Sequence, residues 1–313
     1  MATGIGYLLP TRERIMAGTP ETGPLLRLAE QAEDLGFSSV WIGDSLTARP
    51  RHEPLAVLAA VAARTRRIML GTAVLLPALR NPVLLAHQVA TLDQLSEGRF
   101  ILGVGIAADA PSIRAEFQAA GVPFEKRVGR MLEGLRLCRA LWTGEKVDWS
   151  GRWIVEGGSI GPTPYRPGGP PIWLAGSTPG ALERVGKYFG GWFPIDTDPA
   201  AWHAKWAEIG AHARAAGRDP SALSGAMYLT VALDDNAARA EENLMAYLTG
   251  YYGPRAASVR RRQASYVGPA SGLAAFLDGY AKAGVGHLIV RFAGGDHARG
   301  LETLARVRGE LGW

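Results

Sequence analysis

The chain has 313 residues, of which 47% are hydrophobic and 20% charged, a globular composition with enough apolar material for one large core. This composition argues against disorder as the main state. The 34 basic and 29 acidic residues leave a formal net charge of +5 without forming a basic tail or domain of the kind that binds nucleic acid. We therefore expect a small-molecule partner, with at most a mild preference for anions.

The N-terminal segment gives no sign of a membrane partner. Met1–Pro10 contains only a short apolar run before Arg12, Glu13 and Arg14, which fits neither a signal peptide nor an anchor. No apolar segment approaches the roughly 20 residues of a membrane helix. We expect a cytoplasmic protein. The lone Cys138 has no second cysteine to pair with and is expected to be buried in an apolar helix.

Short apolar or β-branched runs alternate with helical patterns along the chain, which is typical of parallel sheets because each crossover needs a helix. The predicted strands are Gly4–Leu9, Ser39–Gly43, Ile68–Leu76, Phe100–Ile106, Pro171–Ala175, Trp192–Ile195, Ala226–Leu233 and His287–Phe292. The predicted helices are Pro24–Leu35, Pro54–Thr65, Pro82–Leu95, Val128–Trp142, Pro179–Tyr188, Pro199–Ala216, Ala237–Tyr251 and Leu301–Leu311. About eight βα units predict an α/β fold of the (β/α)8 TIM-barrel type rather than a doubly wound sheet.

Two segments interrupt this alternation. Thr143–Gly169 is rich in Gly, Pro and aromatic residues, and Val147–Trp149 and Trp153–Val155 flank a turn as in a small hairpin. Gly253–Gly272 carries several arginines and precedes an additional short helix, Leu273–Ala283. Both segments are too long for simple connections, so they are candidate lids or binding loops. We expect a single barrel domain over residues 1–313 with insertions near 143–169 and 253–272.

The functional residues of a TIM barrel lie where strands end and the following loops begin. Asp44 follows a buried strand directly, where a carboxylate can accept hydrogen bonds from a heterocycle or orient a base, or can simply cap the loop. Asp109 can supply an acid near a substrate or cap its own loop, and Ser45 is a weaker candidate. The predicted strand ends also include Thr72–Val74, Gly105–Asp109, Gly176–Thr178, Asp196 and Arg291.

Gly103-Val104-Gly105-Ile106-Ala107-Ala108 matches the G-x-G-x-x-A dinucleotide fingerprint as a string. Its context argues against this function, because it belongs to the fourth strand and Asp109-Ala110-Pro111 interrupts an immediate helix. A cofactor ring pressing against the main chain explains the glycines equally well.

Gly176-Ser177-Thr178-Pro179 ends a strand and opens a helix, and helix N-termini bind phosphate through unpaired N–H groups and the helix dipole. A plain N-cap has the same sequence. The run Arg260–Arg262 is either a solvated loop or a partner for an anionic tail.

Other chemistries find little support in the sequence. The six histidines include no H-E-x-x-H motif, so we expect no metal. There is no G-x-S-x-G elbow and no Walker A sequence, which removes the commonest hydrolase and nucleotide-hydrolase signatures.

Several longer strings follow one another along most of the chain. They are Val40–Asp44, Ala62–Ile68, Leu70–Val74, Asn81-Pro82, Ala90–Arg99, Leu102–Gly105, Gly121–Phe124, Ala140–Trp142 and Gly169–Trp173. In order and spacing they resemble the luciferase-like monooxygenase family, whose members use a reduced flavin or the deazaflavin F420. The resemblance implies a TIM barrel with its cofactor at the C-terminal mouth.

The resemblance also implies positions for the cofactor. The third strand of this family commonly ends in a non-prolyl cis peptide bond behind the ring system, which would lie here at Ala73-Val74. Asp44 matches an acidic position that contacts the ring in F420-dependent members, whereas Ser45 departs from the histidine that often follows it. Together with the strand-end positions named above, the resemblance gives as candidate cofactor-binding residues Asp44, Ser45, Thr72, Ala73, Val74, Gly105, Ile106, Gly176, Ser177 and Thr178.

These observations lead to one main functional hypothesis, hydride transfer between reduced F420 and a small organic substrate with a C=C, C=N or C=O group, in which Asp44 or Asp109 handles protons. The alternatives are an FMN-dependent monooxygenase with a dry pocket and, more remotely, a non-catalytic flavin-binding barrel. The resemblance makes a homodimer reasonable. If the strand ends gather as expected, Asp44, Ala73, Val74, Gly105 and Ser177 surround one pocket.

Overall fold

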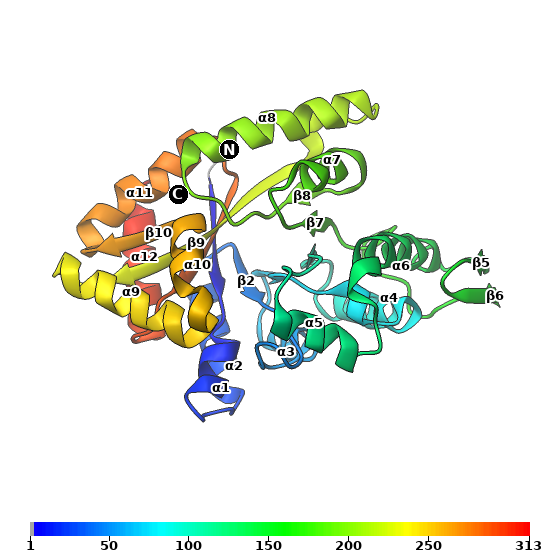
Figure 1. Cartoon of the computed structure of the whole chain (residues 1–313), viewed down its shortest axis with the longest axis horizontal. Helices are drawn as coiled ribbons and strands as arrows, with labels where there is room; N and C mark the ends of the chain where they lie inside the picture. The colour runs from blue at the N-terminus through cyan, green and yellow to red at the C-terminus, as the bar shows by residue number, and fades with distance from the viewer. Residues whose placement is uncertain (1–2) are drawn as a thin grey trace.

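A closed ring of eight parallel strands forms the centre of the computed structural model, which describes residues 3–313 (Figure 1). Around the ring the strands are β1 (Gly4–Leu8), β2 (Ser39–Ile42), β3 (Met69–Thr72), β4 (Phe100–Val104), β7 (Ile172–Leu174), β8 (Gly191–Trp192), β9 (Ser224–Leu233) and β11 (His287–Phe292), which pairs with β1 again. The predicted (β/α)8 barrel is confirmed, and each predicted strand overlaps one of these eight, although the predicted Trp192–Ile195 shares only Trp192 with β8.

Helices surround the ring in the expected alternation. They are α1 (Thr11–Met16), α2 (Gly23–Asp34), α3 (Pro54–Arg64), α4 (Pro82–Leu95), α5 (Pro111–Ala119), α6 (Arg127–Leu141), α7 (Pro179–Tyr188), α8 (Pro199–Ala215), α9 (Ala237–Tyr252), α10 (Ala256–Arg262), α11 (Ala270–Lys282) and α12 (His297–Glu310). Many of them begin with proline in the first turn, where its missing N–H costs nothing. In residues 3–313 none of the helices has the length and apolarity needed to span a membrane.

Side-chain caps explain where several helices start. Asn81 accepts from the N–H groups of Val83 and Leu84 at the start of α4. Asp296 caps α12 in the same way, so this helix begins at His297 rather than at the predicted Leu301. The helices α1, α5 and α10 were not predicted from the sequence.

A ninth strand, β10 (Ser265–Gly268), changes one side of the barrel. It pairs in parallel with the last residues of β9, from Thr230 to Leu233, whereas β8 pairs only with Ser224 and Gly225 at the start of β9. Where the two neighbours meet, Ala264 donates to the Asp196 carbonyl (2.6 Å) and accepts from Thr230 N–H (3.1 Å). The expected binding loop at 253–272 is thus an ordered helix and strand that separate β8 from β9 at the barrel mouth.

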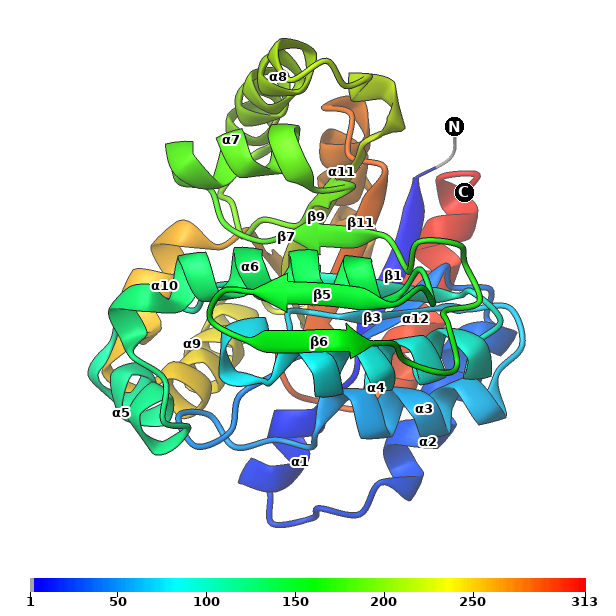
Figure 2. The same cartoon turned by 90° about the vertical axis from the view of Figure 1, so that its right-hand side faces the viewer.

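The predicted hairpin is confirmed as β5 (Val147–Ser150) and β6 (Ile154–Gly158), an antiparallel pair. It lies on the outer side of α4 and α6, away from the barrel (Figures 1 and 2). The expectation that residues 143–169 form a lid or binding loop is wrong for the cavity at the barrel mouth, because none of them lines it. The lone Cys138 is buried in α6, as expected.

Aromatic side chains fill the interior of the barrel below the mouth. The rings of Trp41 and Trp173 lie 5.5 Å apart, and Phe193 lies 5.1 Å from Trp41. Both tryptophans also contact His287, the first residue of β11, so the N-terminal half of the barrel is closed. As in other barrels of this type, the cavity formed by the described residues opens at the C-terminal mouth.

Two strand glycines allow this packing. A Cβ atom at Gly71 would clash with the Trp41 ring, and one at Gly103 would clash with the main-chain oxygen of Thr72. The G-x-G string of β4 is therefore explained at Gly103 by the close approach of β3, not by a cofactor ring.

We expect Gly103→Ala to lower the free energy of unfolding by about 1 to 3 kcal/mol, because the added methyl group meets main-chain atoms that have little room to move. Gly309→Ala is the matched control, since Gly309 lies in the last turn of α12 with no atom near its Cβ position and should gain about 0.5 to 1 kcal/mol. Urea unfolding of both variants measures the difference, and equal effects would refute the packing explanation.

Candidate functional site

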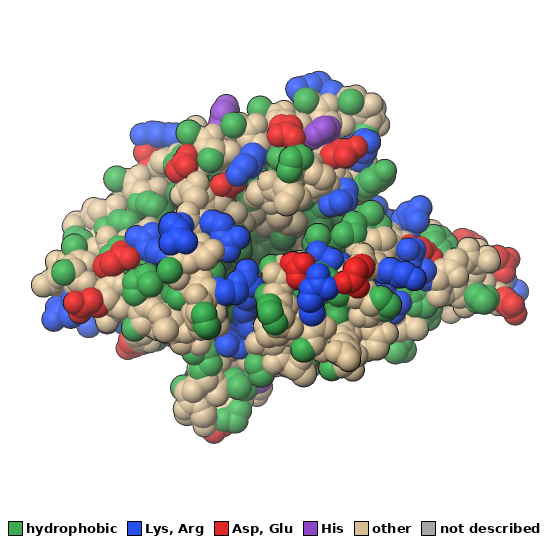
Figure 3. All heavy atoms as spheres, viewed as in Figure 1, with side chains coloured by type: hydrophobic (Ala, Val, Ile, Leu, Met, Phe, Trp, Pro, Cys, Tyr) green, Lys and Arg blue, Asp and Glu red, His purple; other side chains and the backbone are tan. Residues whose placement is uncertain are grey.

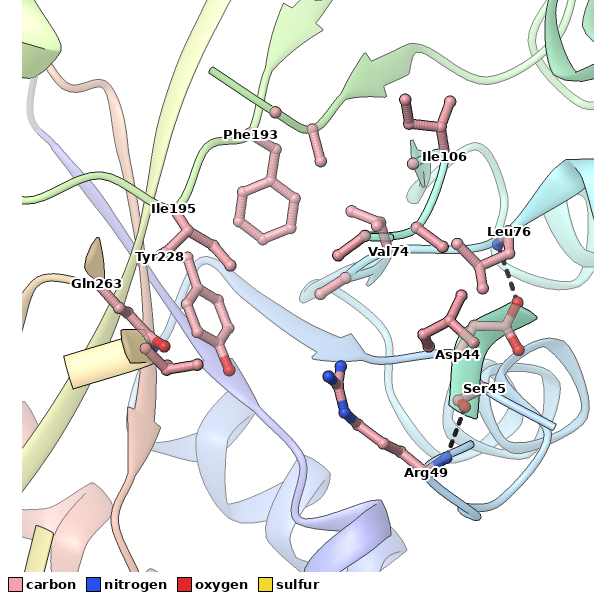
Figure 4. Close-up of a pocket in the computed structure, with 18 of the residues that line it drawn as sticks. Asp44, Ser45, Arg49, Val74, Leu76, Ile106, Phe193, Ile195, Tyr228 and Gln263 are labelled. Carbon is pink, nitrogen blue, oxygen red and sulfur yellow. Dashed lines mark hydrogen bonds between the residues drawn. The ribbon is translucent and has the colours of Figure 1, made fainter. Parts of the chain in front are cut away.

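A cavity of about 660 Å³ opens at the carboxyl ends of the barrel strands. Asp44, Ala73, Val74, Gly105 and Ser177 all line it, so the prediction of one shared pocket is confirmed. Figure 4 labels Asp44 and Val74 among the lining residues. From outside, the hollow is lined by hydrophobic side chains, and Lys and Arg side chains gather around it (Figure 3).

The floor of the cavity is apolar. It is lined by Leu8, Ala73, Val74, Leu76, Ile106, Leu174, Phe193 and Ile195. The Ala73-Val74 peptide bond is cis, as the resemblance implied. Gly105 leaves room for Val74, because a Cβ there would lie 2.7 Å from the valine Cγ2. Thr72 does not line the cavity; it is fully buried and donates to the Gly103 carbonyl at 2.7 Å.

Asp44 is held tightly at one edge of this floor. Its carboxylate accepts from both terminal nitrogens of Arg80, at 2.5 and 3.1 Å, and from Leu76 N–H at 2.9 Å (Figure 4). The aspartate side chain is 1% exposed. Both oxygens therefore already accept hydrogen bonds, and the pair fixes the loop after β2 to the segment after β3. The catalytic role of Asp44 stays a prediction.

Ser45 belongs to a second buried network, centred on Glu116 of α5. Its hydroxyl donates to Glu116 Oε1 at 2.7 Å and accepts from Arg49 N–H at 2.9 Å. The same carboxylate oxygen accepts from three successive N–H groups, those of Leu46, Thr47 and Ala48, at 2.5 to 3.1 Å. One buried oxygen thus organises the whole turn from Ser45 to Arg49.

Glu116 lines the cavity and is fully buried, and its Oε2 atom has no hydrogen-bond partner within residues 3–313. This residue was not predicted from the sequence, because its helix, α5, was not predicted either. The pattern of Ile113, Glu116 and Phe117, three buried residues on one helical face after Pro111, was the available signal.

Asp109, the second predicted catalytic acid, does not line the cavity. It forms a bidentate ion pair with Arg114, at 2.7 and 2.8 Å, on the exposed start of α5. The hydrogen bond from Arg114 lowers the pKa of the Asp109 carboxyl below its ordinary value. Its arrangement gives no support to a catalytic role, which stays a prediction.

The residues predicted to bind phosphate, Gly176–Thr178, line the cavity at the start of α7. Thr178 stands at the N-cap position, yet its side chain makes no capping hydrogen bond. The Ser177 hydroxyl makes only one long contact, 3.5 Å to the Ile195 carbonyl. Arg184 of the same helix also lines the cavity. These hydroxyls are therefore not engaged as a plain helix cap.

Arginines and tyrosines line much of the remaining wall. The arginines are Arg49, Arg51, Arg184, Arg255 and Arg262. Of the run Arg260–Arg262, only Arg262 lines the cavity, and Arg260 forms an ion pair with Glu241 of α9 at 3.0 Å. The strand-end Asp196 is buried and forms an ion pair with Lys205 at 2.5 Å, outside the lining.

Behind the tyrosines lies Arg291 of β11, which is 1% exposed. It donates to the Tyr252 hydroxyl at 3.0 Å and to Thr230 at 2.9 Å, and the rings of Tyr228 and Tyr251 lie about 5 Å from its guanidinium carbon. Arg291 was predicted as a strand-end residue, whereas the tyrosines, which come from β9 and the end of α9, were not predicted.

Comparison with known proteins identifies the family of the chain. The family model described as luciferase-like monooxygenase matches residues 3–296. The chain belongs to the luciferase-like monooxygenase family. The family resemblance seen in the sequence is thereby confirmed.

Individual relatives match the chain over part of its length. The chain is 33% identical over 221 residues to a 5,10-methylenetetrahydromethanopterin reductase of Methanolobus tindarius, covering 70% of this chain and 65% of the relative. It is 38% identical over 180 residues to an F420-dependent glucose-6-phosphate dehydrogenase of Nocardia farcinica, covering 55% and 53%. The matches thus span about half to two thirds of these relatives' lengths.

Solved structures match over nearly the full length. A monooxygenase of Streptomyces bottropensis is 25% identical with a TM-score of 0.80, covering 99% of this chain and 100% of that one. An F420-dependent secondary alcohol dehydrogenase in complex with an F420-acetone adduct has a TM-score of 0.82 at 21% identity, covering 98% of both chains. At that identity the likeness to the dehydrogenase shows the fold alone.

We expect Glu116→Ala to lower the free energy of unfolding by roughly 2 to 4 kcal/mol, because it leaves four donors without their shared acceptor. Glu116→Gln keeps one side-chain oxygen in place of Oε1 and should cost less than half as much. Thermal melts and the rate of protease cleavage in residues 45–49 measure both effects. Equal losses in the two variants would show that the carboxylate charge, not the acceptor position, holds the turn.

Proposed function

We propose that this protein is an F420-dependent oxidoreductase that transfers a hydride between the deazaflavin and a small organic substrate with a C=C, C=N or C=O group. The observation that carries the proposal is the cavity itself. Its mouth combines an apolar floor, the start of α7 and a cationic rim formed by Arg184 and Arg262. The names of the relatives above, an F420-dependent dehydrogenase among them, support the choice of cofactor.

The residues present fit such a cofactor. A flat ring system fits the apolar floor around Val74 and Ile106. A phosphate fits the start of α7, where the helix dipole favours an anion and Arg184 of the same helix also lines the cavity. The exposed Arg262 at the rim offers a partner for the anionic tail. When bound, F420 supplies the carbon that gives or accepts the hydride.

The chain's own contribution is to position the reactants and exclude water. The aromatic side chains of Phe193 and Tyr228 close the cavity from below, so the reacting groups meet away from bulk solvent. For proton handling, we favour Asp44 over Asp109, because Asp44 lines the cavity and Asp109 does not. The two hydrogen bonds from Arg80 hold the Asp44 carboxylate in one orientation at the edge of the ring site.

The second candidate is an FMN-dependent monooxygenase. It is favoured by the likeness to the Streptomyces bottropensis monooxygenase over the full length of the chain. The same apolar floor suits either ring system, so cofactor binding must separate the two functions.

Titration of the purified cofactor-free protein with F420 and with FMN tests the proposal. We expect a dissociation constant for F420 at least tenfold lower than that for FMN, because the cationic rim adds contacts to the longer anionic tail. Tighter binding of FMN, with oxygen consumption when the flavin is kept reduced, would establish the monooxygenase instead. Tight F420 binding without turnover across a panel of alcohols, imines and enones would indicate a non-catalytic barrel.

The phosphate site has its own test. We expect the double variant Ser177→Ala, Thr178→Ala to weaken F420 binding about tenfold, while the melting temperature of the cofactor-free protein stays within about 2 °C, because neither hydroxyl caps α7. The matched control is Ser221→Ala, because this exposed serine lies in a short turn after α8 and does not line the cavity. Unchanged F420 affinity in the double variant would remove the phosphate role from these residues.

A further inference from the structure

One wall of the cavity brings together arginines that form no ion pair within residues 3–313. Arg49 and Arg51 come from the turn after β2, and Arg255 lies just beyond the end of α9. Buried Arg291 lies behind them. The ion pairs of residues 3–313 involve other arginines, so none of these four has a carboxylate partner in the described part of the chain.

The side chain of Arg49 reaches into the cavity. Its guanidinium points into the space between Asp44 and Tyr228 (Figure 4). The two hydrogen bonds of Arg49 within residues 3–313, to the Ser45 hydroxyl and from Arg51 Nε, both use its main chain. Its side chain instead lies over the Tyr252 ring, 4.9 Å from the centroid. The head group is thus placed by packing while its donors face the cavity.

The surroundings of Arg49 disfavour the positive charge of its guanidinium group. Burial and the like charges of Arg51 and Arg255 lower the pKa of Arg49 below its ordinary value. Arg51 is itself built into the wall, because a Cβ atom at Gly43 would clash with its guanidinium. An anion placed between these groups would relieve the repulsion and satisfy the free donors.

This wall is separate from the start of α7. Around the ring of strands, the turn after β2 and the loop after β7 are separated by β3 and β4. The tyrosines that flank Arg49 follow β9, on the other side of β1 and β11. A molecule that lies over the apolar floor therefore has the start of α7 at one end and the wall with Arg49, Arg51 and Arg255 at the other.

We propose that Arg49, assisted by Arg51 and Arg255, binds a carboxylate of the substrate, so that the protein acts on small unsaturated organic acids. That the bound acid is a substrate for hydride transfer rests on the proposed function, whereas the binding of the acid itself does not. A planar guanidinium forms two parallel hydrogen bonds to a carboxylate, and Tyr228, Phe193 and Ile195 offer an apolar surface to the rest of such a molecule.

Cinnamate, an unsaturated aromatic carboxylate, and its uncharged amide are the probes. Binding of each is followed by tryptophan fluorescence, in the cofactor-free protein and in the protein saturated with F420. We expect Arg49→Gln to weaken cinnamate binding at least tenfold while binding of cinnamamide and of F420 changes less than twofold. Arg49→Lys keeps the charge but loses the bidentate geometry and should lie between.

Arg64→Gln is the matched control, since it removes an arginine from the surface of α3, and it should change none of the three affinities. Thermal melts check that each variant is folded.

Equal binding of acid and amide by the unaltered protein, or no binding of cinnamate at millimolar concentration, would overturn the proposal. So would a loss of F420 binding in Arg49→Gln with cinnamate unaffected, since the wall would then hold the cofactor tail. Cinnamate binding that depends on Arg49 in a protein that does not bind F420 would support the acid site and refute the proposed function alone.

Discussion

The mouth of this barrel depends on how the turn after β2 is anchored by two buried carboxylates. Asp44 ties the start of the turn to Arg80, and Glu116 collects the donors of its next residues on one oxygen. Burying a carboxylate is costly unless hydrogen bonds satisfy it, and here the main chain supplies most of them. The consequence is a turn with a fixed path, which holds Arg49 and Arg51 at the cavity although neither lies on a strand or helix.

The two sides of the cavity then differ in physical character. Apolar side chains around Val74 present a dry surface, which suits a ring system. The opposite wall combines arginines with tyrosine rings that accept cation–π contacts and replace carboxylates as neighbours of Arg291. Because these tyrosines are neutral, they stabilise the guanidinium groups without cancelling their charge, so the wall keeps its attraction for anions.

The sequence predicted what depends on periodicity and missed what depends on contacts between distant segments. Eight βα units follow from alternating apolar runs, and strand ends such as Asp44 and Val74 follow from the barrel rule. The four-residue strand β10 has no signal of its own, because its pairing with β9 decides it. Glu116 was missed with its helix, and the outward position of the β5–β6 hairpin is set by packing against α6, which no local pattern encodes.

The strand β10 has a consequence for how this fold can diversify. In a closed barrel, strand number and stagger fix the radius, so a wider opening normally requires changes all around the ring. Here β8 pairs with β9 only at its first residues, and β10 with its preceding helix occupies the place beside the upper part of β9. The circumference can therefore differ between the bottom and the top of one barrel. Lengthening or shortening residues 253–272 would resize the opening while the eight-stranded base keeps its register.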